Sequence, residues 1–263
     1  MQILSKKIFS ALVLFMGVVA LIVLSAAPQP AHAHPWDWFG WGKRVTGSAV
    51  VKTETRAVSG YKGVKLSGSF HVTVVQNGSE GVTIVADDNL LPLISTEVER
   101  GNLYIKWSER NLNVSHQKIT ITVHAKDIDE LSVAGSGNIV ADVINTPRLR
   151  SAIAGSGDIN IKNLTSDALK ISIDGSGNFG AGGLTNEFEV SISGSGGVKI
   201  ASLKTKNAKL SIAGSGDATL WATDTLKVSL AGSGDIRYYG GATLTKSVAG
   251  SGSIKRLGAA PNR

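Results

Sequence analysis

The side chains best suited to do chemistry in this sequence are the acids and amides that follow a recurring Gly-Ser-Gly triplet. The position after each triplet holds, in order, Asn138, Asp158, Asn178, Gly197, Asp217, Asp235 and Ser253. Oxygen atoms repeated at one spacing suit either calcium, which takes several oxygen ligands, or the hydroxyls of a polysaccharide. Asp, Asn and Ser are also turn formers that bond their own backbone, so a structural role for the same residues stays open.

Metal binding and catalysis fit this pattern less well than glycan binding does. The calcium nonapeptide repeat is about half as long as this spacing, and most repeats here supply at most one carboxylate. An acid–base pair needs carboxylates in unlike environments, whereas the regular placement of these acids implies equivalent ones. The acids concerned are Asp158, Asp174, Asp217 and Asp235. We expect no catalytic residue, metal or cofactor, and a ligand-binding ladder made of Asn138, Asp158, Asn178, Asp217 and Asp235.

The sequence also disfavours a nucleotide-binding loop and a catalytic triad. The triplet is not followed by Gly-Lys-Ser/Thr and opens no helix, so it is neither a phosphate-binding loop nor a dinucleotide site. A Ser-His-Asp triad would need His71, His116 or His124, which lie in or beside expected strands outside the repeats. Surface or packing roles are expected for these histidines.

The triplets recur with a nearly constant period, which sets the architecture that positions the acids. Their first glycines are Gly135, Gly155, Gly175, Gly194, Gly214, Gly232 and Gly250. A period near 20 residues indicates one supersecondary unit stacked many times. Such arrays suit extended binding surfaces better than a single catalytic pocket.

Within each repeat the apolar residues alternate with polar ones, as in half-buried strands. In the first repeat Leu131, Val133, Ile139, Ala141 and Val143 fall on one face. Both glycines of the triplet share that inward phase and the serine faces outward, so each triplet is expected to form a corner. About 20 residues at roughly 3.3 Å each suit a three-sided coil whose turns lie about 4.8 Å apart. The sequence therefore predicts an all-β fold, a parallel β-helix (solenoid) with coils of about 20 residues.

Residues 50–130 lack the triplet but also alternate like strands, and we expect them to cap the N-terminal end of the solenoid. Strands are predicted at Val82–Ala86, Leu103–Trp107 and Lys118–His124, with turns between them. Leu66–Phe70 is similar to a degenerate corner. The C-terminal end has no comparable cap, only Lys255, Arg256 and a short tail. Those charges could blunt an exposed strand edge, or that end could meet a partner.

Composition agrees with an exported protein held together by packing. The chain has 263 residues, 31 glycines and no cysteine, which excludes disulfides and thiolate sites. Residues 131–263 carry 14 Lys and Arg against 9 Asp and Glu. This mild positive balance could favour anionic envelope polymers, but no interleaving of aromatic and basic residues indicates nucleic acid.

The N-terminus is typical of a secretory signal. Lys6 and Lys7 precede the apolar stretch Ile8–Leu24, and Ala31-His32-Ala33 supplies a cleavage site. An uncleaved membrane anchor is the alternative reading of the same stretch. We expect a signal peptide at 1–33, a flexible Trp-rich tail at 34–49, the solenoid domain at 50–256 (cap strands 50–130, repeats 131–256) and a tail at 257–263.

These segments together resemble the head GIN domain family of exported bacterial proteins, the putative auto-transporter adhesins. The resemblance covers roughly residues 50–256 and rests on three features: Arg56–Val64, Val82–Ile94 and the recurring Gly-Ser-Gly-Asp/Asn-Ile. It implies a right-handed parallel β-helix and carries no known catalytic chemistry.

The expected function is that of an exported, non-catalytic adhesin or envelope-binding module. Its partner would be a cell-envelope polysaccharide or another surface component, with no nucleic acid and no membrane span after signal cleavage. The expected location is the periplasm, the cell surface or the medium. The alternative is a structural protein that self-associates through its C-terminal solenoid edge. A carbohydrate-active enzyme is the third hypothesis.

Overall fold

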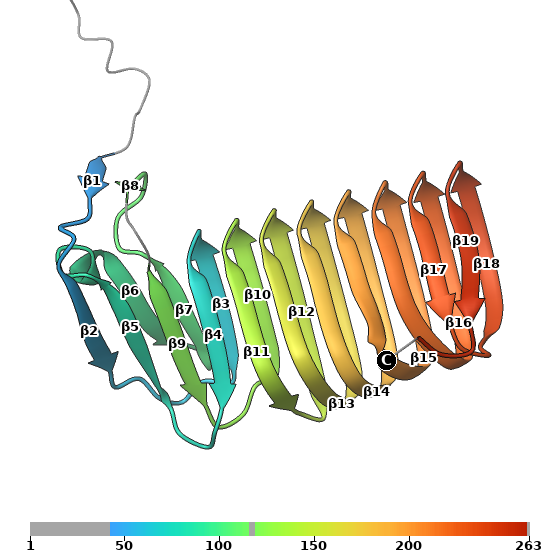
Figure 1. Ribbon diagram of the computed structural model, residues 1–263, viewed down its shortest axis with the longest axis horizontal. Coiled ribbons are helices and arrows are strands. Elements are labelled where there is room, and N and C mark those ends of the chain that lie inside the picture. Colours follow the sequence, from blue (N-terminus) through green and yellow to red (C-terminus); the bar gives the residue numbers. More distant parts are fainter. Residues whose placement is uncertain (1–42, 116–118, 262–263) are drawn as a thin grey trace, which may run out of the picture. The chain divides into compact units, whose positions relative to one another are not determined.

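The computed structural model describes residues 43–115 and 119–261 (Figure 1). The expected signal peptide and residues 34–42 lie outside them. The described chain is built from strands, with one short 3-10 helix, η1, at Leu91–Leu93. The all-β fold predicted from the repeat is confirmed.

The repeats form two parallel ladders of strands (Figure 1). In the first ladder each strand ends at a corner: β3 (Gly63–Gly68), β10 (Glu130–Gly135), β12 (Arg148–Gly155) and β18 (Thr243–Gly250). In the second each strand starts after a corner: β4 (His71–Gln76), β11 (Asn138–Asn145), β17 (Asp235–Tyr239) and β19 (Ser253–Gly258). Four longer strands take part in both ladders: β13 (Asp158–Gly175), β14 (Asn178–Gly194), β15 (Gly197–Gly214) and β16 (Asp217–Gly232). Successive coils therefore stack in register, as a parallel β-solenoid requires.

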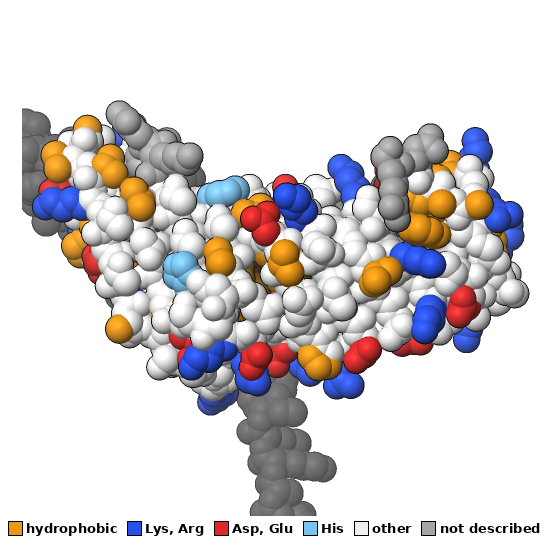
Figure 2. Space-filling model, turned by 60° about the horizontal axis from the view of Figure 1, so that its bottom comes forward, with side chains coloured by type: hydrophobic (Ala, Val, Ile, Leu, Met, Phe, Trp, Pro, Cys, Tyr) orange, Lys and Arg blue, Asp and Glu red, His pale blue; other side chains and the backbone are white. Residues whose placement is uncertain are grey.

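Each coil has three sides. In β13 the alternation of buried and outward side chains is broken at Lys162–Asn163 and again at Asp167–Ala168. Two consecutive outward residues mark a change of direction, because neighbours on a straight strand face opposite sides. Together with the Gly-Ser-Gly corner, these breaks leave a short side at residues 163–167. This short side lies at the bottom of Figure 1 and comes forward in Figure 2.

The Gly-Ser-Gly corners pack backbone against backbone from one coil to the next. Gly175 has a φ of +126°, and a Cβ built there would lie 2.4 Å from the carbonyl oxygen of Gly155. A Cβ on Gly177 would lie 2.2 Å from the carbonyl oxygen of Gly157. The exposed Ser176 donates its amide to the Gly155 carbonyl at 2.8 Å. Glycine is thus needed both for the backbone conformation and for the close approach of the coils.

Aliphatic side chains stack in rows inside the solenoid. One row consists of Ile153, Ile173, Ile192, Ile212 and Leu230, each at most 2% exposed. The adjacent row is interrupted by Ser151, between Leu131 and Ile171. The Ser151 Oγ is buried and has no hydrogen-bond partner among the described residues. From Ile171 to Val228 the row is apolar, so the hydroxyl is a local defect in the core.

The predicted alternation is wrong at the end of the first repeat. Val143, expected to face inward, is 47% exposed, and Ile144 is buried in its place. Val143 pairs in register with Asn163, so it lies at the corner where two residues in a row face outward. A period-two pattern carried through such a corner is displaced by one residue and assigns the wrong face.

Antiparallel strands close the N-terminal end of the solenoid. These strands are β2 (Val51–Arg56), β5 (Gly81–Asp87), β9 (Thr120–Ala125), β6 (Ile94–Glu99) and β7 (Asn102–Trp107). β5 runs antiparallel to β2 and β9, and β6 runs antiparallel to β7. The largely buried Arg56 side chain of β2 donates to the carbonyls of Leu91 (2.8 Å) and Ile94 and to Thr96 Oγ1. It thereby joins the outermost strand of one ladder to the outermost strand of the other.

Two of the expected boundaries fall elsewhere in the structure. Gly68 pairs in register with Gly135 and has a φ of +121°, so Leu66–Phe70 is a true corner and the solenoid begins before residue 131.

Part of the segment 34–49, expected to be a flexible tail, is a strand. This strand is β1 (Arg44–Thr46), which pairs with β8 (Asn113–Ser115). The carbonyl of Thr46 also accepts from Asn89 Nδ2 at 2.9 Å.

Among the described residues no strand covers the C-terminal end of the solenoid. Its outermost strands are β18 and β19, and Val248 and Leu257 are 41% and 39% exposed there. Lys246 pairs in register with the buried Val228, so a cation stands where the preceding coil has an aliphatic core residue. An inward-facing charge on an outermost strand opposes edge-to-edge pairing with another sheet.

Replacement of a corner glycine tests the close approach of the coils. Gly175→Ala should lower the free energy of unfolding by about 2–5 kcal/mol, because left-handed strain adds to displacement of the neighbouring coil. Urea unfolding followed by circular dichroism measures this. Ser176→Ala, in the same triplet, is the control and should stay within about 0.5 kcal/mol of the parent. Equal losses in the two variants would contradict this account of the corner.

Removal of the unpaired core hydroxyl should stabilise the protein. Ser151→Ala relieves a buried group whose lack of a partner costs about 1–3 kcal/mol, so we expect a gain of about 1 kcal/mol and a higher Tm. Ser172→Ala, at an outward position in the next coil, should change stability by less than about 0.5 kcal/mol. A loss of stability in Ser151→Ala would mean that the hydroxyl has a partner such as bound water.

Candidate functional site

The five candidate ladder residues lie in one outward row beside the Gly-Ser-Gly corners. In register, the row runs through Asn138, Asp158, Asn178, Gly197 and Asp217. It continues to Asp235, whose amide donates to Asp217 Oδ1 at 2.8 Å, and then to Ser253. Residues separated by 18 to 20 positions in sequence are thus neighbours in space.

Acids and amides in the row already accept hydrogen bonds from the next coil. Asn138 Oδ1 accepts from the amide of Asp158 at 3.2 Å. Asp158 Oδ1 accepts from both the amide and the side chain of Asn178, at 2.9 and 3.0 Å. The bonds tie one coil to the next, rather than a turn to its own backbone. Among the described residues the Oδ2 atoms of Asp158 and Asp217 have no hydrogen-bond partner, which leaves them available to a ligand.

The last acid of the row has a perturbed titration. The Ser253 hydroxyl donates to Asp235 Oδ1 at 2.7 Å and lowers the pKa of Asp235 below its ordinary value. Arg237, whose guanidinium lies 3.1 Å from Asp235 Oδ2, lowers this pKa further. Asp235 therefore stays ionised at neutral pH, with its charge partly compensated by Arg237.

Gly197 divides the row into two parts. Gly197 is buried, and a Cβ there would lie 2.8 Å from the side-chain oxygen of Asn178. The Asn178 amide therefore occupies the space that an acid at 197 would need. The row is two shorter segments, one ending at Asn178 and one starting at Asp217.

The remaining sequence candidates are not brought together. Asn77 Nδ2 lies 3.1 Å from His124 Nδ1, and His71 pairs in register with Asn138 at the start of the row. His116 lies outside the described residues. In the part of the chain that the structure describes, no three His, Asp or Glu side chains are grouped so as to hold a metal ion. The same part contains no apolar helix of membrane-spanning length.

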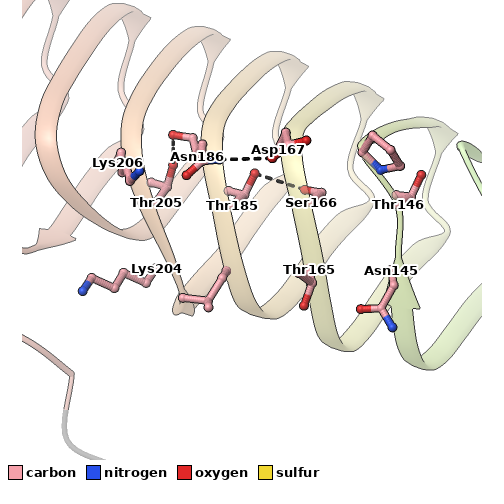
Figure 3. A pocket seen from close by; sticks show the side chains of 12 residues that line it. Asn145, Thr146, Thr165, Ser166, Asp167, Thr185, Asn186, Lys204, Thr205 and Lys206 are labelled. Carbon is pink, nitrogen blue, oxygen red and sulfur yellow. Dashed lines mark hydrogen bonds between the residues drawn. The ribbon is translucent and has the colours of Figure 1, made fainter.

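A second candidate site, absent from the sequence reasoning, lies on the short side of the solenoid. It is a trough of about 630 Å³ that crosses several coils (Figure 3). One wall is Thr165, Leu184 and Lys204; the other is Asp167, Asn186 and Lys206; the floor is Ser166, Thr185 and Thr205. Figure 2 shows isolated hydrophobic side chains among basic and acidic ones on the face that comes forward.

The trough coincides with a local departure from the repeat. In neighbouring coils Leu164 and Leu203 are fully buried on the short side, but Gly183 takes that position in β14. The leucine of this coil is displaced by one residue to Leu184, which is 57% exposed in the trough wall. The sequence signal is the shorter interval between Gly175 and Gly194, together with Gly182-Gly183-Leu184.

Fold and site together define a class of protein: a β-solenoid that presents rows of polar side chains and an open trough to solvent. The chain belongs to the family described as putative auto-transporter adhesin, head GIN domain, whose profile matches residues 60–242. The family predicted from the residues is thereby confirmed. No curated protein matches the chain.

Solved structures of similar fold carry related names. A putative lipid binding protein from Parabacteroides distasonis is 26% identical, with a TM-score of 0.70, and the match covers 82% of this chain and 100% of that one. A putative adhesin from Bacteroides fragilis is 22% identical, with a TM-score of 0.74 and coverage of 81% and 100%. A putative adhesin from Parabacteroides merdae is 21% identical, with a TM-score of 0.68 and coverage of 81% and 99%. The last two matches support the fold alone.

A pair of substitutions at one ladder position separates its structural role from its charge. Asp158→Ala removes the acceptor for the Asn178 amide, and should cost about 1–3 kcal/mol of unfolding free energy, as for other hydrogen bonds to charged groups. Asp158→Asn keeps an oxygen in the same place and should recover most of that loss. Thermal and urea unfolding of both variants would check this. If Asp158→Asn were as unstable as Asp158→Ala, the charge rather than the acceptor would hold the coils together.

Proposed function

We propose that this protein is an exported, non-catalytic adhesin-like module that binds a cell-envelope glycan or another surface component along the sides of its solenoid. The observation that carries the proposal is the register: outward side chains recur coil after coil in straight rows. A linear polymer with its own short repeat can contact such rows at several coils at once, and many weak contacts then add to useful affinity. Membership of an adhesin-named family supports the same reading.

Export and the lack of catalysis are parts of this proposal. The basic and apolar N-terminal segment with its Ala31-His32-Ala33 site supports export. The ladder acids accept hydrogen bonds from the neighbouring coil, which favours a structural and binding role over acid–base catalysis.

Self-association through the C-terminal end is the second candidate. The open strands β18 and β19, with the exposed Val248 and Leu257, favour it, whereas Lys246 at an inward position opposes it. Light scattering over a wide range of protein concentration separates the two cases. A monomer at all concentrations would count against assembly, and growth into larger species that Val248→Lys abolishes would support it.

Binding to envelope polymers is the direct test of the proposed function. The purified protein should be retained on immobilised cell-envelope polysaccharides and should release no new reducing ends or unsaturated sugars from them. The triple variant Asp158→Asn, Asp217→Asn, Asp235→Asn keeps side-chain oxygens for the coil contacts. If the ladder binds, this variant should lose at least about tenfold in affinity while its unfolding free energy changes by no more than about 1 kcal/mol per site.

Two outcomes would count against parts of this proposal. Unchanged retention of the triple variant would remove the ladder as the binding site. Binding to lipid vesicles but to no polysaccharide would replace the glycan by a lipid, the ligand class in the name of the Parabacteroides distasonis protein.

A further inference from the structure

The trough on the short side has the dimensions of a ligand site. Its volume of about 630 Å³ lies within the roughly 300–1,000 Å³ of typical small-molecule sites. Its lining comes from four successive coils, from residues 145–147 to residues 204–206, so it runs along the solenoid axis for about three coil spacings, or ~14 Å. A segment of an extended chain would fit it better than a compact ligand.

The hydroxyl groups on the floor of the trough are already hydrogen-bonded within the protein. The Ser166 hydroxyl donates to Thr185 Oγ1 at 3.1 Å, and Thr185 Oγ1 donates to the carbonyl of Glu187 at 3.2 Å. Thr205 Oγ1 lies within hydrogen-bond distance of the carbonyl of Asn207. These three hydroxyls are buried and bonded within the protein, so recognition must come from the walls.

The walls combine one apolar surface, two cations and the carboxylate of Asp167, which accepts from Asn186 Nδ2 at 3.2 Å. Leu184 is more than half exposed in the middle of one wall, at the place where the repeat shifts by one residue. Lys204 is next to it in register, and its Nζ lies 5.6 Å from the centre of the Trp221 ring. Lys206 stands on the opposite wall (Figure 3). Neither lysine forms an ion pair with a described carboxylate.

A second hollow of the solenoid has a different lining. On the first ladder, Glu189 lies between Lys170 (3.2 Å) and Lys209 (3.0 Å), and Asn207 donates to Glu187 at 2.8 Å. Its central acids are therefore already matched by cations and amide donors of the protein. Arg148, Arg150 and Lys227 also line this hollow, so it is more basic than the trough. The trough differs because it leaves an apolar side chain, Leu184, in contact with water.

We propose that the trough binds a short extended segment of an acidic glycan, with a sugar carboxylate between Lys204 and Lys206 and the apolar face of a sugar ring on Leu184. This inference rests on the proposed function and specifies the ligand class and the residues that select it. Two lysines on opposite walls can both contact one anionic group. A neutral sugar would gain no such electrostatic attraction. The exposed leucine supplies the apolar contact that sugar rings make through their C–H groups.

The test uses an array with uronic-acid oligosaccharides (oligogalacturonate, oligomannuronate and hyaluronan fragments) beside neutral oligosaccharides, followed by calorimetric titration. We expect at least one uronate to bind about tenfold more tightly than any neutral glycan. Raising the salt from about 50 to about 500 mM should weaken that binding several-fold, because the contact is partly exposed. The variant Lys204→Gln, Lys206→Gln should lose at least about tenfold, and Leu184→Ser a comparable amount.

A matched control lies in the same strand. Lys199 is an exposed lysine of β15 on another side of the coil, so Lys199→Gln removes one charge without touching the trough. Its affinity should stay within about twofold of the parent. Unfolding midpoints should be unchanged in all these variants, since every substituted side chain is exposed.

The possible results separate this inference from the proposed function. Equal binding of neutral and acidic glycans, or unchanged affinity in the double lysine variant, would overturn the acidic-glycan site. If binding is lost only in the Asp158→Asn, Asp217→Asn, Asp235→Asn variant, the glycan lies on the ladder and the proposed function stands. If the unmodified protein binds no glycan on the array, both fail.

Discussion

The stacking of glycine corners is the constraint on which the rest of this structure depends. At Gly155, Gly175 and Gly194 a Cβ would lie about 2.5 Å from the carbonyl oxygen of the preceding corner, which no real side chain tolerates. The corners can approach this closely only because both glycines lack a side chain. That contact holds successive coils in one register. Because of the register, equivalent positions of the sequence repeat lie next to one another in rows along the solenoid.

Because the rows follow from the register, most of them serve the solenoid itself. The inward rows form the core, and the outward Asn/Asp row ties several neighbouring coils together through backbone amides. A polar row that already joins the coils is, on its own, weak evidence of ligand binding. Positions where the array departs from its own pattern are more informative, since the stacking does not require them. Leu184 is such a position, because its neighbours Leu164 and Leu203 remain buried in the core.

The sequence predicted what is local and periodic, and it failed where distant segments meet or where the period changes. The alternation identified the inward residues, the corners and the Asn/Asp row, because each follows from spacing along one strand. It misplaced Val143, because two outward residues at a corner reverse the phase. The antiparallel cap and the Arg56 bonds to Leu91 and Ile94 join segments 35 to 38 residues apart, and no periodicity records them. The trough was missed because its walls belong to a short side whose two corners carry no glycine triplet.

The two ends of the solenoid bear on how it can meet a partner. At the N-terminal end Arg56 satisfies carbonyls that would otherwise offer acceptors to another chain. At the C-terminal end no described strand pairs with the outer edges of β18 and β19, but Lys246 replaces the aliphatic residue that would continue the core. A second solenoid stacked there would have to bury that ammonium group without a carboxylate, which is costly. End-to-end growth is therefore disfavoured at both ends by different means. The sides, with their regular rows and the trough at Leu184, are the surfaces left free to bind a long polymer.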